Sequence, residues 1–161
     1  MTVPGSNGAG RRRTSKPVRP LAIKKGLFML RIPRSIYQKM LDHAKRESPL
    51  ECCGMLGGKD KTVQKSFELE NTEKSPVLYS MSPQEQMKVF EEMEKESMEM
   101  IAIYHSHPKT IPFPSETDVK QTFYPDVSSV IVSLKEEGNP VMKAFQISKE
   151  AIYLEEIEVI S

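Results

Sequence analysis

The chain has 161 residues, of which 28% are charged and 38% hydrophobic, and its formal net charge is +1. This length fits one compact domain with a single hydrophobic core. No stretch has the apolar length of a membrane helix, and the start has no apolar segment typical of a signal peptide.

The basic residues are concentrated at the start of the chain. Nine of them lie between Arg11 and Arg34, whereas the first acidic residue is Asp42. The remaining sequence has 14 basic and 22 acidic residues, a formal net charge of −8. An acidic body disfavours nucleic-acid binding, because phosphates are bound by positively charged surfaces. The basic arm could touch phosphates or an acidic partner, or be only a solvated extension.

The two cysteines, Cys52 and Cys53, are adjacent and cannot pair with each other without severe backbone strain. No disulfide framework is therefore possible, which is typical of a reducing, cytoplasmic setting. Neighbouring strand residues point to opposite faces, so we expect both cysteines to be buried as small apolar residues and not to bind metal.

Residues 1–22 are rich in proline, glycine and basic residues, a composition that predicts a disordered basic tail. Residues 23–161 are predicted to form the single folded domain. In that domain, residues 26–32 form an apolar run typical of a strand, and Ile36, Met40 and Ala44 then recur at helical spacing before Pro49. His43 lies on this helix, where we expect a surface position.

A hairpin and a second helix are predicted next. Residues 51–58 and 62–69 read as two strands that pair across a turn at Gly57 to Lys61. Ser82, Pro83 and Glu85 form a capping-box start for a helix that extends to about residue 97. Met87, Phe90 and Met93 are predicted to form its buried face.

The last third of the chain is predicted to be mostly strand. Residues 101–107 alternate as a strand, prolines at 108, 112 and 114 force a loop, and a short helix follows from about residue 115. Residues 127–134, 141–147 and 151–160 complete the pattern as three strands. The whole predicts an α/β (mixed α+β) fold with a mixed sheet flanked by helices.

Two histidines at strand spacing carry the chemistry. His105 and His107 point to the same face of their strand, and the following loop can bring Asp118 back beside them. Two imidazoles and a carboxylate leave one tetrahedral zinc position open, which is typical of catalytic zinc sites. As an alternative, the histidines could simply pack in the core, and Ser115 with Asp118 could be only a helix-capping pair.

HSHP, then six residues, then SETD resembles the metal motif of the JAMM (MPN-plus) metalloprotease family. That motif is His-x-His, seven residues, Ser, two residues, Asp. The family also has an upstream glutamate, often followed by Cys-Gly, and LECCGMLGG places Glu51 there, with Cys53 and Gly54 in register. The resemblance covers roughly residues 26–150 and implies an MPN/JAMM domain with the fold of the cytidine deaminases, without the ligands of those enzymes.

The resemblance implies a role for each matching residue. One Zn²⁺ ion would be held by His105, His107 and Asp118. Glu51 would act as general base, and Ser115 would donate a hydrogen bond to the oxyanion of the tetrahedral intermediate. Alternatively, Glu51 could be a surface strand residue and Ser115 only a helix cap. Ser106, between the histidines, should point away from the metal.

The compact segment after Asp118 is similar to the prokaryotic members of the family, which act on small ubiquitin-like sulfur-carrier proteins. The resemblance therefore implies a zinc hydrolase acting at the carrier's C-terminal glycine, for example releasing cysteine. A deubiquitinase-like isopeptidase and a non-catalytic MPN scaffold remain alternatives. The oligomeric state is left open.

Overall fold

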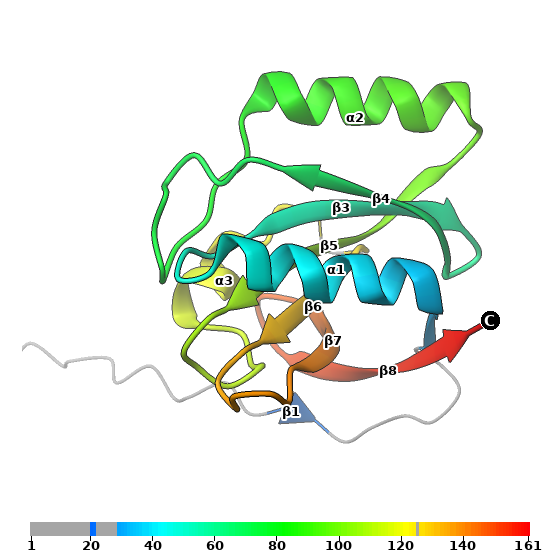
Figure 1. Cartoon of the computed structure of the whole chain (residues 1–161). Helices are drawn as coiled ribbons and strands as arrows, with labels where there is room; N and C mark the ends of the chain where they lie inside the picture. Colours follow the sequence, from blue (N-terminus) through cyan, green and yellow to red (C-terminus); the bar gives the residue numbers. More distant parts are fainter. Residues whose placement is uncertain (1–19, 22–28, 125) are drawn as a thin grey trace, which may run out of the picture.

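The computed structural model describes residues 20–21, 29–124 and 126–161 (Figure 1). They form one eight-stranded sheet in the order β1-β8-β2-β4-β3-β5-β6-β7. The strands are β1 (Pro20–Leu21), β2 (Met29–Pro33), β3 (Cys53–Lys59), β4 (Thr62–Leu69), β5 (Glu99–His107), β6 (Ser128–Ser133), β7 (Val141–Ile147) and β8 (Ile152–Ile160). The helices are α1 (Arg34–Glu47), α2 (Pro83–Lys95) and α3 (Glu116–Lys120). The predicted mixed α/β architecture is confirmed.

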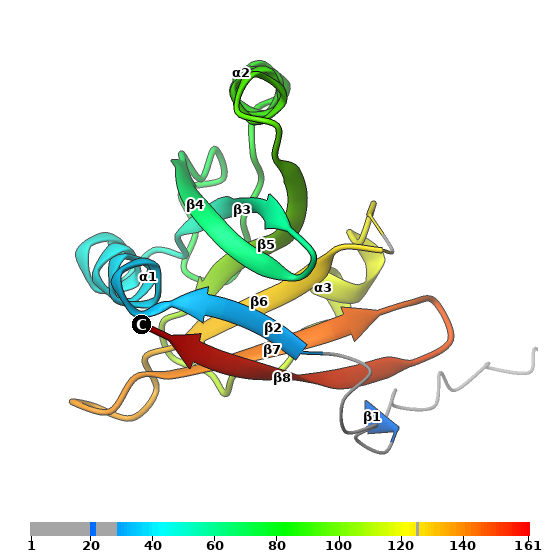
Figure 2. The ribbon, with the colours of Figure 1, turned by 90° about the vertical axis from the view of Figure 1, so that its right-hand side faces the viewer.

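The sheet curls back on itself through β8, its C-terminal strand (Figure 2). The first part of β8 pairs antiparallel with β7, where Ile152 lies opposite Ile147. The second part pairs parallel with β2, from Met29 opposite Glu156 to the end of both strands. One strand therefore links the two sides of the sheet, and both orientations occur in it.

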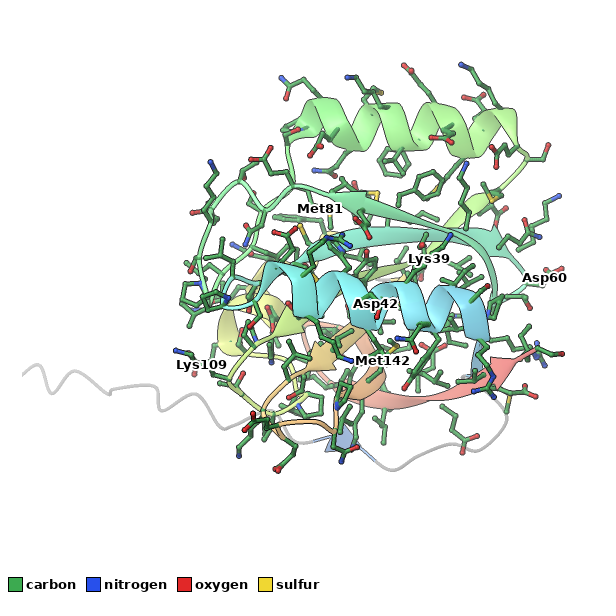
Figure 3. The ribbon with its side chains drawn as sticks, in the orientation of Figure 1. Lys39, Asp42, Asp60, Met81, Lys109 and Met142 are labelled. Carbon is green, nitrogen blue, oxygen red and sulfur yellow. The ribbon has the colours of Figure 1, made fainter. Side chains whose placement is uncertain are left out.

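The hairpin of β3 and β4 is confirmed, but the prediction that its turn extends from Gly57 to Lys61 is wrong, because Gly57 and Gly58 still pair with β4 as part of β3. The turn has only two residues. Asp60 and Lys61 both adopt left-handed conformations, with φ of 50° and 61°, as in the tight turns whose twist matches paired strands. Figure 3 labels Asp60 at this tip. Cys53 lies opposite Leu69 at the other end of the hairpin, so β4 leads the chain back toward the start of β3.

Helices α1 and α2 cover opposite faces of the sheet. Leu56 of β3 belongs to the core cluster under α1, whereas its neighbour Met55 packs in the cluster under α2 with Val89 and Met93. This alternation is what a strand buried on both faces produces. Cys52 and Cys53 are both buried, as expected.

Two predictions about helical faces are wrong. His43 is 4% exposed rather than on the surface, because it lies on the buried side of α1 and its Nδ1 atom is 2.8 Å from the Tyr104 hydroxyl. Met87 is 60% exposed rather than buried. It lies about 200° around the helix from Val89, whose row contacts the sheet. Phe90 is half-buried, and Met93 is buried as predicted.

The tail predicted over residues 1–22 lies outside the described residues, apart from Pro20 and Leu21. These two form β1, which pairs parallel with Ile152 and Tyr153 of β8. Among the described residues, no helix is both long and apolar enough to cross a membrane.

Candidate metal centre

His105 and His107 lie at the end of β5, with their side chains buried on the same face of the sheet. Their Nε2 atoms are 3.1 Å apart. Ser106 between them points the other way, and its Oγ accepts a hydrogen bond from the Cys52 backbone N–H at 2.8 Å. The prediction that Ser106 points away from the imidazoles is therefore confirmed, and its hydroxyl ties β5 to the segment before β3.

Asp118 reaches the two histidines from the first turn of α3. Ser115 is the N-cap of this helix and accepts a hydrogen bond from the Asp118 backbone N–H at 3.0 Å. In return, Asp118 Oδ2 accepts from the Ser115 backbone N–H at 2.8 Å. The same Oδ2 atom lies 3.2 Å from His105 Nε2 and 3.1 Å from His107 Nε2. The capping box is thus the device that aims the carboxylate at the imidazoles.

The three converging atoms have the spacing of a metal-binding face. They form a triangle with sides of 3.1 to 3.2 Å. In tetrahedral zinc sites with ligand bonds of about 2.0 Å, neighbouring ligand atoms lie about 3.3 Å apart. The donor set of two imidazole nitrogens and one carboxylate oxygen also suits zinc. The residues present therefore fit a tetrahedral ion that keeps one position open.

Both imidazoles are fixed by neighbours outside the triangle. His107 Nδ1 lies 2.9 Å from the Ile111 carbonyl oxygen, a partner to which it can only donate, so Nε2 is left with its lone pair. The Tyr79 ring stacks on the His105 ring, with centroids 4.5 Å apart and planes 23° apart. Such support sets the orientation of metal-binding histidines.

Glu51 lies two residues before the start of β3, whereas the sequence predicted that the strand begins at Glu51. Its Oε1 atom is 4.0 Å from His107 Nε2, and it forms a possible ligand group with both histidines within 4.8 Å. Asp118 Oδ2 is closer to both imidazoles, which favours Asp118 as the third ligand. Glu51 Oε2 is buried and has no hydrogen-bond partner among the described residues, as expected for an atom meant to meet a water or substrate proton.

The charged groups of the centre perturb one another strongly. Burial raises the pKa of Glu51 to about 8, with Asp118 adding to the rise and His107 opposing it. Burial also acts to raise the pKa of Asp118, but hydrogen bonds from His105 and His107 outweigh it and hold that pKa far below its usual range. The pKa of His107 is raised, because its bonds to Asp118 and the Ile111 carbonyl outweigh the effect of burial. Such a cluster of shifted groups is typical of a functional site.

A pocket of about 290 Å³ opens beside the triangle. His105 and Asp118 form part of its wall, together with Tyr79, Ile103 and Tyr124. Met81, labelled in Figure 3, also lines it from the segment that precedes α2. A substrate bound in this pocket would lie directly against the proposed ligands.

The structure brings together all five residues that the sequence singled out, with Ser115 exposed at the edge of the group. Tyr79 was missed. It belongs to the irregular segment between β4 and α2, where no periodicity or motif indicates which side chain turns toward the histidines.

Residues 33–148 match the family model described as prokaryotic homologs of the JAB domain. The CysO-cysteine peptidase of Mycobacterium tuberculosis is 32% identical over 143 residues, which cover 87% of this chain and 98% of that protein. The desampylase of Pyrococcus furiosus is 41% identical over 73 residues, covering 45% of this chain and 52% of that protein.

Solved structures with the same fold are also similar. A protein from Desulfitobacterium hafniense, solved in solution, has a TM-score of 0.76 and 36% identity, over 83% of this chain and 94% of that one. A JAB1/MPN domain protein from Archaeoglobus fulgidus has a TM-score of 0.54 and 20% identity, over 81% of this chain and all of that one (100%). The second likeness supports the fold alone.

Proposed function

Because this chain belongs to the family of prokaryotic homologs of the JAB domain, we propose that it is a zinc metallopeptidase acting on a small ubiquitin-like sulfur-carrier protein. It would hydrolyse the bond after the carrier's C-terminal glycine, for example releasing cysteine. The observation that carries this proposal is the convergence of two imidazole nitrogens and one carboxylate oxygen at 3.1 to 3.2 Å beside a pocket. The relative named CysO-cysteine peptidase supports the substrate class.

The proposed zinc ligands are His105, His107 and Asp118, for one ion per chain. When bound, zinc would polarise the scissile carbonyl and increase the acidity of a water molecule. The residues themselves supply the orientation. The Ile111 carbonyl fixes the His107 ring, and the Ser115 capping box fixes the Asp118 carboxylate.

Glu51 is proposed as the general base. Its carboxylate borders the triangle at His107, and its Oε2 atom has lone pairs that no described residue uses. It would take a proton from the attacking water and then deliver it to the leaving amine.

Ser115 is proposed to stabilise the oxyanion that forms when water attacks the carbonyl. Its Oγ accepts the Asp118 N–H, so its own O–H is free to donate to another oxygen. The cap geometry holds this hydroxyl beside the proposed ligands. A preorganised donor of this kind contributes most where negative charge develops.

The carrier tail is proposed to enter in an extended conformation, by strand addition or along the groove beside the metal. Asp118 is the one carboxylate in the described wall of the pocket, which contains no lysine or arginine and otherwise consists of His105 and uncharged side chains. A chain end of small residues, such as a Gly-Gly tail, can approach such a wall closely.

Isopeptide-bond cleavage in ubiquitin-like conjugates is the second candidate function. It requires the same ligands and the same base and differs only in the leaving amine. The desampylase relative supports this alternative. A scaffold without catalysis is the third, and the presence of every residue of the motif speaks against it.

The test combines zinc content with cleavage of two substrates, a carrier joined to cysteine and the same carrier joined to a lysine side chain. We expect about one zinc per chain, lost in His107→Ala, and cleavage about 10³-fold slower in Glu51→Gln. Glu150→Gln, in the exposed turn before β8, makes the same chemical change away from the centre and serves as the control. Unchanged cleavage by Glu51→Gln would refute its role. Bound zinc with neither substrate cleaved would refute the peptidase proposal in favour of a scaffold.

A further inference from the structure

Residues 70–82 connect β4 to α2 without a helix or strand and pass over the candidate metal centre. Loops of this length inside a compact domain commonly serve a function. Besides a hydrogen bond from Asn71 to the Glu51 carbonyl, this connection makes two other contacts with the centre. The Ser75 carbonyl accepts the Glu51 backbone N–H at 2.9 Å, and the Tyr79 ring stacks on His105.

Asn71 organises this loop with its side-chain amide. Its Nδ2 atom donates to the carbonyl oxygens of Glu51 and Leu78, at 3.0 and 2.9 Å. Its Oδ1 atom accepts from the backbone N–H groups of Glu73 and Ser80, at 3.0 and 3.2 Å. All four hydrogen-bonding positions of the amide are therefore used. A flipped amide would face each partner with the wrong group, so the network also determines its orientation.

These partners lie next to the contacts that Ser75 and Tyr79 make with the centre. Glu51 precedes β3, so its carbonyl is held by Asn71 rather than by the sheet ladder. Leu78 and Ser80 flank Tyr79, so the same amide holds both sides of the residue that stacks on His105. Asn71 is only 9% exposed, and water therefore cannot easily replace these bonds.

We propose that Asn71 is a positioning residue that holds the general base Glu51 and the His105-stacking Tyr79 as one unit. The proposal rests on the proposed function, because it assigns Asn71 an effect on the rate through Glu51. A small displacement of Glu51 would lengthen the path of the proton without removing any metal ligand. Groups outside the ligand shell typically change metal affinity or activity by about 10- to 100-fold when they are replaced.

Asn71→Asp is the sharpest test, because it keeps the shape of the side chain but replaces two N–H donors with an oxygen that faces two carbonyls. We expect kcat for carrier–cysteine cleavage to fall about 10- to 100-fold, with KM and zinc content nearly unchanged. Asn139→Asp introduces the same charge in the exposed turn between β6 and β7 and should cleave like the wild type. If Asn71→Asp does not fold, Asn71→Ser, which keeps one donor, replaces it.

A double mutant separates positioning from general destabilisation. If Asn71 acts through Glu51, Asn71→Asp should cause no further loss of rate when Glu51 is already glutamine. An equal loss in both backgrounds, or wild-type kcat in Asn71→Asp, would overturn the proposal.

Amide hydrogen exchange provides a readout that does not depend on cleavage. The Glu51 amide, which donates to the Ser75 carbonyl, should exchange at least about 10-fold faster in Asn71→Asp and unchanged in Asn139→Asp. If the wild-type protein cleaves neither substrate, the proposed function fails, and this exchange rate still decides the role of Asn71. Unchanged exchange in Asn71→Asp would overturn it.

Discussion

Replacing Tyr104 with phenylalanine removes a hydroxyl group that lies 2.8 Å from His43 Nδ1. Tyr104 is 1% exposed and His43 4% exposed, so water cannot take the place of the lost partner. A hydrogen bond contributes about 1 kcal/mol net, and a buried polar atom left unsatisfied costs about 1 to 3 kcal/mol. We therefore expect the free energy of unfolding to fall by about 2 kcal/mol. For a domain of this size, that corresponds to a melting temperature lower by about 4 to 8 °C.

Urea denaturation of the metal-free proteins measures this loss. We choose about pH 7.5, because most histidines are neutral at that pH. Tyr37→Phe is the matched control, because the Tyr37 hydroxyl on α1 makes no hydrogen bond to any described residue. Its stability should change by less than about 0.5 kcal/mol. The reasoning is refuted if Tyr104→Phe loses no more than this control.

Three further predictions concern the stability of the metal-free protein. The pKa of Glu51 is raised to about 8, so its ionisation opposes folding as the pH rises above 4.5. Glu51→Gln should therefore have a higher melting temperature than the wild type at about pH 9, and the two proteins should melt alike near pH 4.5. Equal melting temperatures at the higher pH would contradict this. Burial lowers the pKa of His43 below 6.5 despite the nearby Glu68, so His43 stabilises the fold above that pH and loses this contribution as the pH falls. Denaturation curves should show that the difference in stability between the wild type and His43→Gln shrinks below about pH 6.5. A constant difference would contradict this. In Gly54→Ala the new methyl group would overlap the Tyr104 ring and a backbone carbonyl, so urea denaturation should show a free energy of unfolding lower by about 1 to 3 kcal/mol. A stability equal to that of the wild type would show that these neighbours can move aside.

The parts of the centre that follow local rules could be predicted from the sequence. His105 and His107 share a face because a strand alternates, and Ser115 aims Asp118 because a capping box has a fixed geometry. The pairing of β3 with β4 followed from their apolar runs, although the predicted turn between them was too long. In each case the information lies within a few neighbouring residues.

The parts that depend on distant partners could not be predicted. His43 is buried because Tyr104, 61 residues later, provides a partner for its ring nitrogen. Asn71 carries four hydrogen bonds, but a single asparagine in a polar loop has no distinguishing pattern. Met87 illustrates a different limit: an amphipathic helix has several apolar rows, and the sheet against which it packs decides which row is buried.

The double pairing of β8 has a consequence for the order in which the chain folds. All residues of the candidate metal centre lie between Glu51 and Asp118, whereas the strand that joins β2 to β7 begins only at Ile152. The contacts between β2 and β8 therefore span more than a hundred residues, and such long loops close late and slowly. During synthesis, the residues of the centre would leave the ribosome before the strand that closes the sheet, while the edges of β2 and β7 were still unpaired and open to association.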